Sequence, residues 1–185
     1  MNRLKYKKVI NQPTNLMNNH TFLRLIDPVK DKMFRLALRL LISKEAAEDA
    51  TQEVILKIWN RKDKVKDYAN LEAFMISVTK NYCLDQLKAR ANNNLRIIHT
   101  NYDSNELSVH SQLELTDEMK HIERILKMLP EQQKIIFQLR DVEEYDYCEI
   151  AEITKMKEPA IRVTLSRARK KIKEELLKAH GYGIK

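Results

Sequence analysis

Glycine is almost absent from this chain of 185 residues: the only two, Gly181 and Gly183, lie in the last five positions. A phosphate-binding P-loop, a G-x-G-x-x-G turn and a G-x-S-x-G nucleophile elbow all need glycine where the backbone turns sharply or touches a ligand, so these motifs are absent. Hairpin turns that depend on glycine are also missing, which argues against an all-β fold. Because Leu, Ile, Lys, Glu, Ala, Arg and Met make up much of the chain, we expect an all-α protein.

The net charge of +8, with a pI near 9.4, is unevenly distributed along the chain. Residues 1–92 carry 18 Lys and Arg against 10 Asp and Glu, and residues 120–185 carry 15 against 11. Between them, residues 93–119 carry one basic residue against five acidic ones. Two basic blocks on either side of an acidic spacer favour an acidic partner such as nucleic acid, although Lys-rich surfaces also occur in proteins that bind nothing anionic.

The two cysteines, Cys83 and Cys148, each fall within an amphipathic pattern, and we expect both to be buried free thiols in a reducing compartment. No cysteine or histidine pair has metal-ligand spacing, so we expect neither a metal nor a cofactor. No apolar run reaches the length of a signal peptide or a membrane span. The sequence therefore predicts a cytoplasmic protein with no membrane insertion.

The first predicted module follows an Asn-rich tail, residues 1–20, and covers residues 21–92. Its first helix spans residues 21–42 and is interrupted by Pro28. Ser43 can cap a second helix to Trp59, and Asn70 a third to Arg90. The expected core stripes are Met33, Phe34, Ala37, Leu38 and Leu41, then Ala47, Ala50, Thr51, Val54 and Ile58, then Leu71, Phe74, Met75, Val78 and Tyr82.

The second predicted module covers residues 116–180 and follows a polar linker, residues 93–115, that could span up to about 75 Å at about 3.3 Å per residue. The pattern predicts four helices, beginning near Thr116, Pro130, Asp146 and Pro159. Asp146 and Glu149 have the spacing of a capping box. Because the linker is long, the two basic blocks could lie far apart.

The last two predicted helices have helix-turn-helix spacing: residues 146–154, a short turn, then residues 159–178. Residues 155–173 hold eight basic residues and one acidic residue. A helix of this kind can lie in the major groove of DNA, where Arg contacts guanine and Lys contacts phosphates. A solvated charged helix is the alternative interpretation.

Two groups of motifs, in order along the chain, resemble bacterial RNA polymerase sigma factors of the extracytoplasmic-function (ECF) group. LPEQQ (residues 129–133), EIAE (residues 149–152) and LSRARKK (residues 165–171) are similar to region 4 of these factors. AEDATQEV (residues 47–54) resembles the second-helix motif of region 2, and residues 74–88 resemble the promoter-melting helix. The resemblance covers most of residues 21–178 and implies that region 2 is the first module and region 4 the second.

The resemblance also implies partners and site residues. The partners are core RNA polymerase, promoter DNA and an anti-sigma factor, and the expected role is promoter recognition and melting without an active site of its own. Core polymerase would be bound by Asp49, Gln52 and Glu53. The −10 element would be bound by Lys62, Lys66, Asn70, Lys80, Asn81, Lys88 and Arg90. The −35 element would be bound by Arg162, Val163, Ser166, Arg167, Arg169 and Lys170.

The chain departs from the family pattern around its helix-turn-helix. The turn commonly contains glycine, but here it is residues 154–157, and a left-handed residue there would cost about 1–2 kcal/mol. Pro159 and Ala160 replace the usual Gly-Thr, and Thr164 stands where Arg is common. Two alternative functions remain: a stand-alone helix-turn-helix regulator whose first module dimerises or senses a ligand, and a helical adaptor that binds only protein. No group of residues supports an enzyme.

Overall fold

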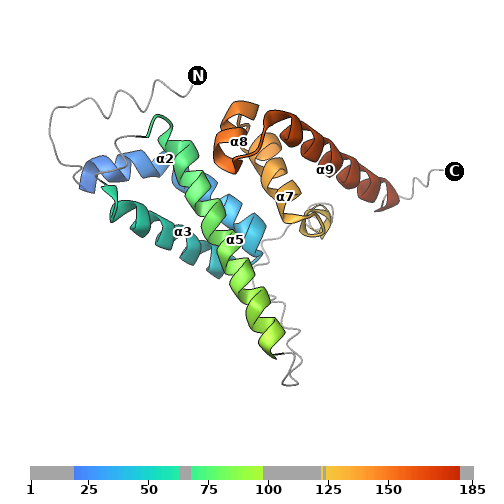
Figure 1. Ribbon diagram of the computed structural model, residues 1–185, viewed down its shortest axis with the longest axis horizontal. Helices are drawn as coiled ribbons and strands as arrows, with labels where there is room; N and C mark the ends of the chain where they lie inside the picture. The colour runs from blue at the N-terminus through green and yellow to red at the C-terminus, as the bar shows by residue number, and fades with distance from the viewer. Residues whose placement is uncertain (1–18, 63–67, 98–121, 123, 180–185) are drawn as a thin grey trace.

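The computed structural model describes residues 19–62, 68–97, 122 and 124–179, and within these ranges all regular structure is helical (Figure 1). This confirms the predicted all-α fold. Residues 1–18 of the predicted N-terminal tail and residues 98–115 of the predicted linker lie outside the described residues. Residues 19–20 and 93–97, which were predicted to belong to the tail and the linker, are helical.

Helices α2 (Asn19–Leu41) and α3 (Lys44–Trp59) form the first helical pair. Pro28 lies inside α2 and does not interrupt it, and its exposed position keeps the ring out of the core. Ser43 caps α3 as predicted, because its hydroxyl accepts a hydrogen bond of 3.1 Å from the amide of Ala46. The five residues of the predicted α3 stripe are all buried.

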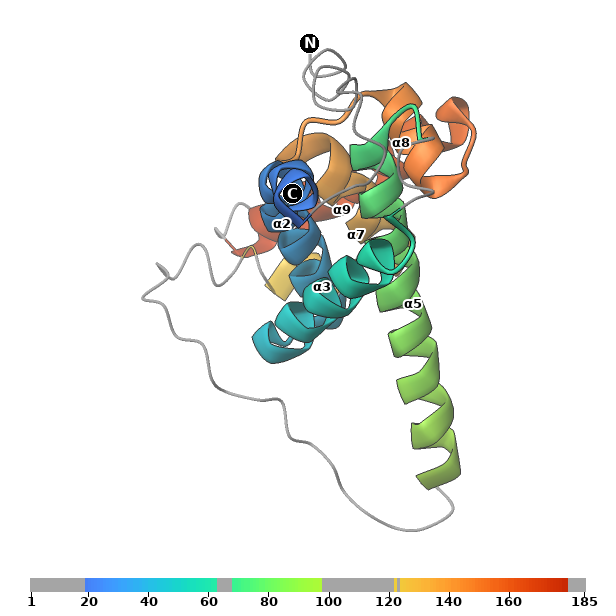
Figure 2. The same cartoon turned by 90° about the vertical axis from the view of Figure 1, so that its left-hand side faces the viewer.

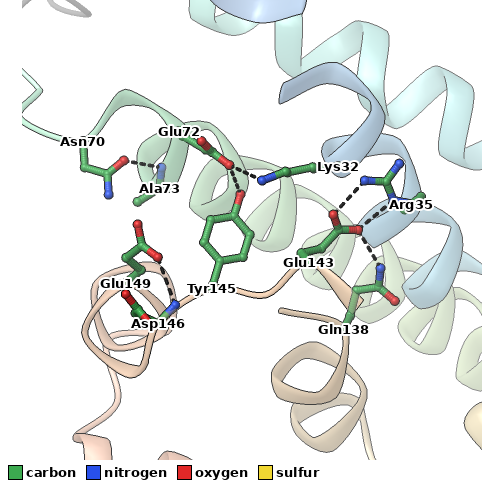
Figure 3. A network of polar contacts seen from close by, with 10 residues as sticks. All are labelled: Lys32, Arg35, Asn70, Glu72, Ala73, Gln138, Glu143, Tyr145, Asp146 and Glu149. Atoms are coloured by element: carbon green, nitrogen blue, oxygen red, sulfur yellow. Dashed lines mark hydrogen bonds and ion pairs between the residues drawn. The ribbon is translucent and has the colours of Figure 1, made fainter. Parts of the chain in front are cut away.

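Helix α5 (Leu71–Ile97) is longer than predicted. Asn70 caps it through a 3.0 Å bond from the amide of Ala73 to its side-chain oxygen (Figure 3). The helix continues through three consecutive asparagines, residues 92–94, that had suggested a linker. Each asparagine lowers helix stability by less than about 1 kcal/mol relative to alanine. No glycine or proline follows directly to end the helix. The C-terminal part of α5 projects away from the other helices (Figures 1 and 2).

The second module contains a helical segment at residues 122 and 124–127, then α7 (Glu131–Phe137), α8 (Tyr147–Thr154) and α9 (Glu158–Ala179). The predicted start at Thr116 lies outside the described residues. A feature that the sequence did not predict is η1 (Gln138–Val142), a π-helical turn that directly follows α7. Such turns insert one extra residue into a helix and often mark functional sites.

The two modules pack directly against each other. Helix α5 contacts α8, and α2 contacts α7 and η1. One apolar cluster runs through both modules and includes Met33 and Met75 from the first and Ile136 and Ile150 from the second. The sequence had suggested modules that could lie far apart, but hydrophobic burial holds them together in this structure.

The two cysteines have different environments. Cys83 is fully buried, as predicted, and burial raises the pKa of its thiol to about 12. Cys148 is exposed, so the prediction that it is buried is wrong. Helix α8 buries Ile150 and Ile153, and Cys148 lies two residues before Ile150, about 200° around the helix and so on the opposite face.

Candidate nucleic-acid interface

The helix-turn-helix formed by α8 and α9 is held by local backbone chemistry. The predicted capping box is present: Glu149 accepts a 2.9 Å hydrogen bond from the amide of Asp146 (Figure 3). Lys155 ends α8 in the left-handed conformation, with φ 62°, and its amide donates to the carbonyl of Ala151 at 2.8 Å. The turn without glycine is therefore built around a left-handed lysine, the conformation whose cost the sequence analysis stated.

Helix α9 has an apolar inner face and a basic outer face. Ile161, Leu165 and Ala168 are buried against the module. All six residues predicted to bind the −35 element are exposed: Arg162, Val163, Ser166, Arg167, Arg169 and Lys170. We call this set the α9 outer face. Thr164, where the family commonly has Arg, donates a 2.8 Å hydrogen bond to the carbonyl of Ala160.

Two arginines of the α9 outer face are oriented by residues of other elements. The Nε of Arg169 donates to Asp141 of η1 at 2.9 Å, and a second bond makes the pair bidentate. This hydrogen bonding raises the pKa of Arg169. The guanidinium of Arg162 lies 3.9 Å from the ring centroid of Tyr147, whose ring also lies 5.0 Å from Arg140. Such contacts limit the rotamers available to each arginine.

Sequence reasoning missed the positioning roles of Tyr147 and Asp141. Tyr147 was seen only as part of a capping sequence, and Asp141 lies 28 residues before Arg169. The separation of Asp141 from its partner gives no local pattern from which the pair could be found. The aromatic residue at the first position of α8 was the available signal, because a ring there lies close to the following helix.

The predicted −10 residues on α5 fall into two groups. Asn81, Lys88 and Arg90 are exposed, and Lys88 forms a 3.6 Å ion pair with Asp85. Lys80 is only 8% exposed, and its amine donates to the carbonyl of Ile153 in α8 at 3.1 Å. Burial lowers the pKa of Lys80, and the charge of Lys155 acts in the same direction. In this arrangement Lys80 is not available to a DNA phosphate.

The other predicted −10 residues surround the loop between α3 and α5. Lys62 lies 4.1 Å from the ring centroid of Trp59, and Asn70 is engaged as the cap of α5. Lys66 lies outside the described residues. Tyr68 stacks on Phe74 with a centroid distance of 3.8 Å and is 42% exposed. An exposed ring in this position could stack on an unpaired base.

The predicted polymerase-binding residues share the outer face of α3. Asp49, Gln52 and Glu53 are exposed, and the opposite face of the helix is buried. These three residues form an acidic and polar surface, which we call the α3 acidic face. The other exposed residues of this module include many lysines and arginines.

The described ranges contain neither a metal-binding cluster nor a membrane-spanning helix. No three residues of the types His, Cys, Asp and Glu lie close enough together there to hold a metal ion. No helix in those ranges combines the length and the apolar character needed to cross a bilayer.

Comparisons with known proteins agree with this arrangement. The family models for sigma-70 region 2 and sigma-70 region 4 match residues 25–93 and residues 120–172, respectively. The ECF RNA polymerase sigma factor SigE of Mycolicibacterium smegmatis is 26% identical over 157 residues, which are 80% of this chain and 58% of that protein. The probable RNA polymerase sigma factor RfaY of Xanthomonas campestris pv. campestris is 24% identical over 160 residues, 83% of this chain and 40% of that protein. The chain thus spans about half the length of these curated relatives.

Solved structures show the same fold. The sigma factor RpoE of Bartonella quintana, in complex with the anti-sigma factor NepR, matches with a TM-score of 0.71 at 22% identity, over 84% of this chain and 96% of that chain. CnrH, in complex with the cytosolic domain of CnrY, matches with a TM-score of 0.65 at 16% identity, over 96% of this chain and 97% of that chain. With both sigma-70 regions matched in the order of the two helical modules, the chain belongs to the sigma-70 family of RNA polymerase sigma factors, in its extracytoplasmic-function group.

Proposed function

We propose that this chain binds core RNA polymerase, recognises the −10 and −35 elements of a promoter, and assists opening of the duplex. The observation that carries the proposal is the α9 outer face, which presents exposed basic residues on the second helix of a helix-turn-helix. A major groove accepts such a helix, and Arg167 is free to reach a base edge because the structure gives it an exposed position.

The first module would act on the −10 element. Asn81 and Lys88, seven residues apart, share one exposed face of α5, where they can contact a single strand through its phosphates and base edges. Arg90 is exposed on the opposite side of the helix. Pulling a base from the stack costs a few kcal/mol, and binding of the opened strand would supply that free energy. Promoter opening by this route needs no catalytic residue, so the chain is proposed to be a non-enzymatic factor acting in the cytoplasm.

The α3 acidic face is proposed to bind core polymerase. Asp49 and Glu53 are four residues apart and therefore lie side by side on the helix, with Gln52 next to them. An exposed acidic surface on a basic protein would otherwise weaken binding to DNA, so it is better suited to a basic protein surface. The similarity to RpoE with NepR and CnrH with CnrY supports an anti-sigma factor as a further partner.

Run-off transcription with purified core polymerase tests the proposal. Templates drawn from a promoter library should give transcripts that start at defined positions only when this protein is added. Core enzyme alone and a variant with Asp49→Lys, Gln52→Lys and Glu53→Lys serve as controls. A complete lack of protein-dependent transcripts across the library would refute the proposal.

A stand-alone helix-turn-helix regulator is the second candidate, favoured by the exposed α9 outer face alone. Gel-shift experiments separate the two functions. A sigma factor should bind promoter duplex much more tightly with core polymerase present, whereas a stand-alone regulator would bind equally well without it.

A further inference from the structure

An exposed valine lies at the centre of the α9 outer face. Helix α9 contacts α7 and α8 on one side, and its other side faces away from the rest of the molecule (Figure 1). Val163 is 49% exposed. Successive residues of an α-helix are about 100° apart, so this valine lies nearly opposite the three buried residues of the helix, Ile161, Leu165 and Ala168. The side chain therefore takes no part in packing the second module.

Helix formation does not explain a valine at this position. Valine is β-branched and loses side-chain freedom in a helix, so it is a poorer helix former than the alanine, leucine, arginine and lysine that make up much of α9. A single exposed apolar residue is common on protein surfaces and is not informative by its exposure alone. What is informative is that Val163 stands in the middle of a basic helix face that is proposed to enter a DNA groove.

The arginines around Val163 differ in whether the chain itself engages them. Arg162 pairs with Glu158 one turn earlier in α9, and Arg169 pairs with Asp141 of η1. Arg167 is exposed and has no ion pair within the described part of the chain. Because Arg167 lies four residues after Val163, the two side chains are neighbours on the same side of the helix. The middle of the α9 outer face thus presents one apolar side chain beside one arginine that no carboxylate holds.

This pair matches two features of base edges in the major groove. The apolar feature there is the C5-methyl group of thymine, and the commonest partner of arginine is guanine, whose O6 and N7 accept two hydrogen bonds. Val163 lies in the second turn of α9, near the end of a recognition helix that contacts base edges. Facing cytosine, the same side chain would meet an amine to which valine offers no acceptor.

The helix geometry also limits the distance between the two bases. Four residues of an α-helix rise about 6 Å, and successive bases of B-DNA are about 3.4 Å apart along the duplex. A helix lying along the groove would therefore place the base contacted by Val163 within about two base pairs of the base contacted by Arg167.

From this arrangement we propose that Val163 is a specificity-determining residue. It selects thymine, through the 5-methyl group, at one position of the −35 element, within about two base pairs of a guanine bound by Arg167. The inference rests on the proposed function, because it takes α9 as the helix that enters the major groove. It adds the chemical identity of two bases in the DNA that the chain would recognise.

Replacement of thymine by uracil tests the contact, because uracil lacks only the methyl group and pairs with adenine in the same way. Selection from duplexes randomised over the −35 region, with the full-length chain in the presence and absence of core polymerase, gives the preferred sequence. Each thymine in it is then replaced by uracil, and fluorescence anisotropy measures the affinity. One replacement should weaken binding of the wild type about fourfold, the effect of one methyl group withdrawn from an apolar contact.

Val163→Ala should bind the thymine and uracil duplexes equally well. Alanine is the better helix former, so this variant should fold, and circular dichroism checks its helix content. Val142→Ala is the matched control, because Val142 is also an exposed valine of the second module, 44% exposed, but lies in η1 and not in α9. This control should keep the wild-type response to uracil. Equal responses to uracil in the wild type and Val163→Ala would overturn the proposal, as would a preferred sequence without a methyl-sensitive thymine.

The neighbouring guanine is tested in the same duplex with 7-deazaguanine, which lacks the N7 acceptor. This replacement should weaken binding of the wild type several-fold and leave binding of Arg167→Ala unchanged. The guanine identified in this way should lie within about two base pairs of the methyl-sensitive thymine. A larger separation would overturn the proposed pair of contacts.

Run-off transcription separates a failure of this inference from a failure of the proposed function. Protein-dependent transcripts without a methyl-sensitive thymine would overturn the inference and leave the proposed function standing. Methyl-sensitive binding that Val163→Ala abolishes, in a chain that never supports transcription, would refute the sigma-factor role. The thymine contact would then stand as part of a stand-alone regulator.

Discussion

The guanidinium group of Arg162 lies over the ring of Tyr147, 3.9 Å from its centroid, and so links α9 to the first turn of α8. Arg162 also pairs with Glu158 at 3.2 Å, one turn earlier in α9. The two contacts hold the arginine near the start of α9, the end of a helix-turn-helix recognition helix that contacts base edges. Tyr147 is therefore a positioning residue in the proposed DNA interface.

Replacing Tyr147 by Leu should weaken binding to a −35 duplex by about two- to fivefold, the effect of losing about 0.5–1 kcal/mol of cation–π interaction. Fluorescence anisotropy of a labelled duplex measures the affinity. Tyr147→Phe is the control, because it keeps the ring and should bind nearly as well as the wild type. Equal affinities for the Leu and Phe variants would show that the ring does not position Arg162.

Arg167 and Lys170 should differ in how they contribute to DNA binding. Arg167→Ala should cost about 1–3 kcal/mol on the preferred −35 sequence and much less on other sequences, because arginine can contact a base edge. Lys170→Ala should weaken binding to all sequences evenly and reduce the salt dependence by about one phosphate contact. Titrations at several salt concentrations on matched and scrambled duplexes measure both effects. Equal losses on all sequences from both variants would mean that the face contacts phosphates only.

The α3 acidic face should affect polymerase binding and not DNA binding. Glu53→Lys should lower the affinity for core polymerase about tenfold or more, because a lysine replaces an acid at a proposed basic partner surface. Asp27→Lys makes the same charge change at an exposed position of α2. It is the matched control and should have little effect. Pull-down of core enzyme at modest salt would provide the measurement. Similar losses from both variants would point to overall charge as the cause.

Asn70 should contribute to stability through its cap on α5. Asn70→Ala removes the 3.0 Å bond from the amide of Ala73 and should lower the free energy of unfolding by about 1 kcal/mol. Asn70→Ser keeps a capping oxygen and should lower the free energy of unfolding by only a few tenths of a kcal/mol. Urea denaturation gives both values. If the serine variant keeps full stability but loses −10 binding, Asn70 also contacts DNA.

Cys83 should make stability fall at alkaline pH. Burial raises the pKa of its thiol from 9.0 to about 12, so the unfolded chain releases this proton at a lower pH than the folded chain does. Stability is therefore intact below pH 9 and is lost as the pH rises toward 12, at about 1.4 kcal/mol per pH unit once the pH is well above 9. The wild type should lose this stability relative to Cys83→Ala, which lacks the group. Urea titrations of both proteins at pH 7 and pH 10.5 measure their free energies of unfolding. If the difference between the two free energies is the same at both pH values, Cys83 does not contribute.

The helices were predictable from sequence where local chemistry decides them. Ser43, Asn70 and Asp146 each mark a helix start that the structure confirms, and the buried stripe of α3 follows from its spacing. The end of α5 was not predictable, because without glycine or proline a polar sequence can continue as a helix beyond the core.

The site was predictable in part. The exposed basic side of α9 follows from helical periodicity, which places Arg162 and Arg167 away from the buried Ile161. The environment of Lys80 was not predictable, because it depends on contact with Ile153, which is 73 residues away in sequence. The π-helical turn was also missed, since its sequence has no pattern that distinguishes it from an α-helix.

The π-helical turn at Gln138–Val142 makes the length of this segment critical. This turn already accommodates one extra residue, so one more residue inserted into α7 would rotate everything after it by about 100° around the axis. Asp141 would then turn away from Arg169, and Glu143 from Arg35. A single insertion here would thus displace both the carboxylate that orients Arg169 and the carboxylate that joins the two modules, whereas a substitution of Asp141 or of Glu143 would affect only one of these contacts.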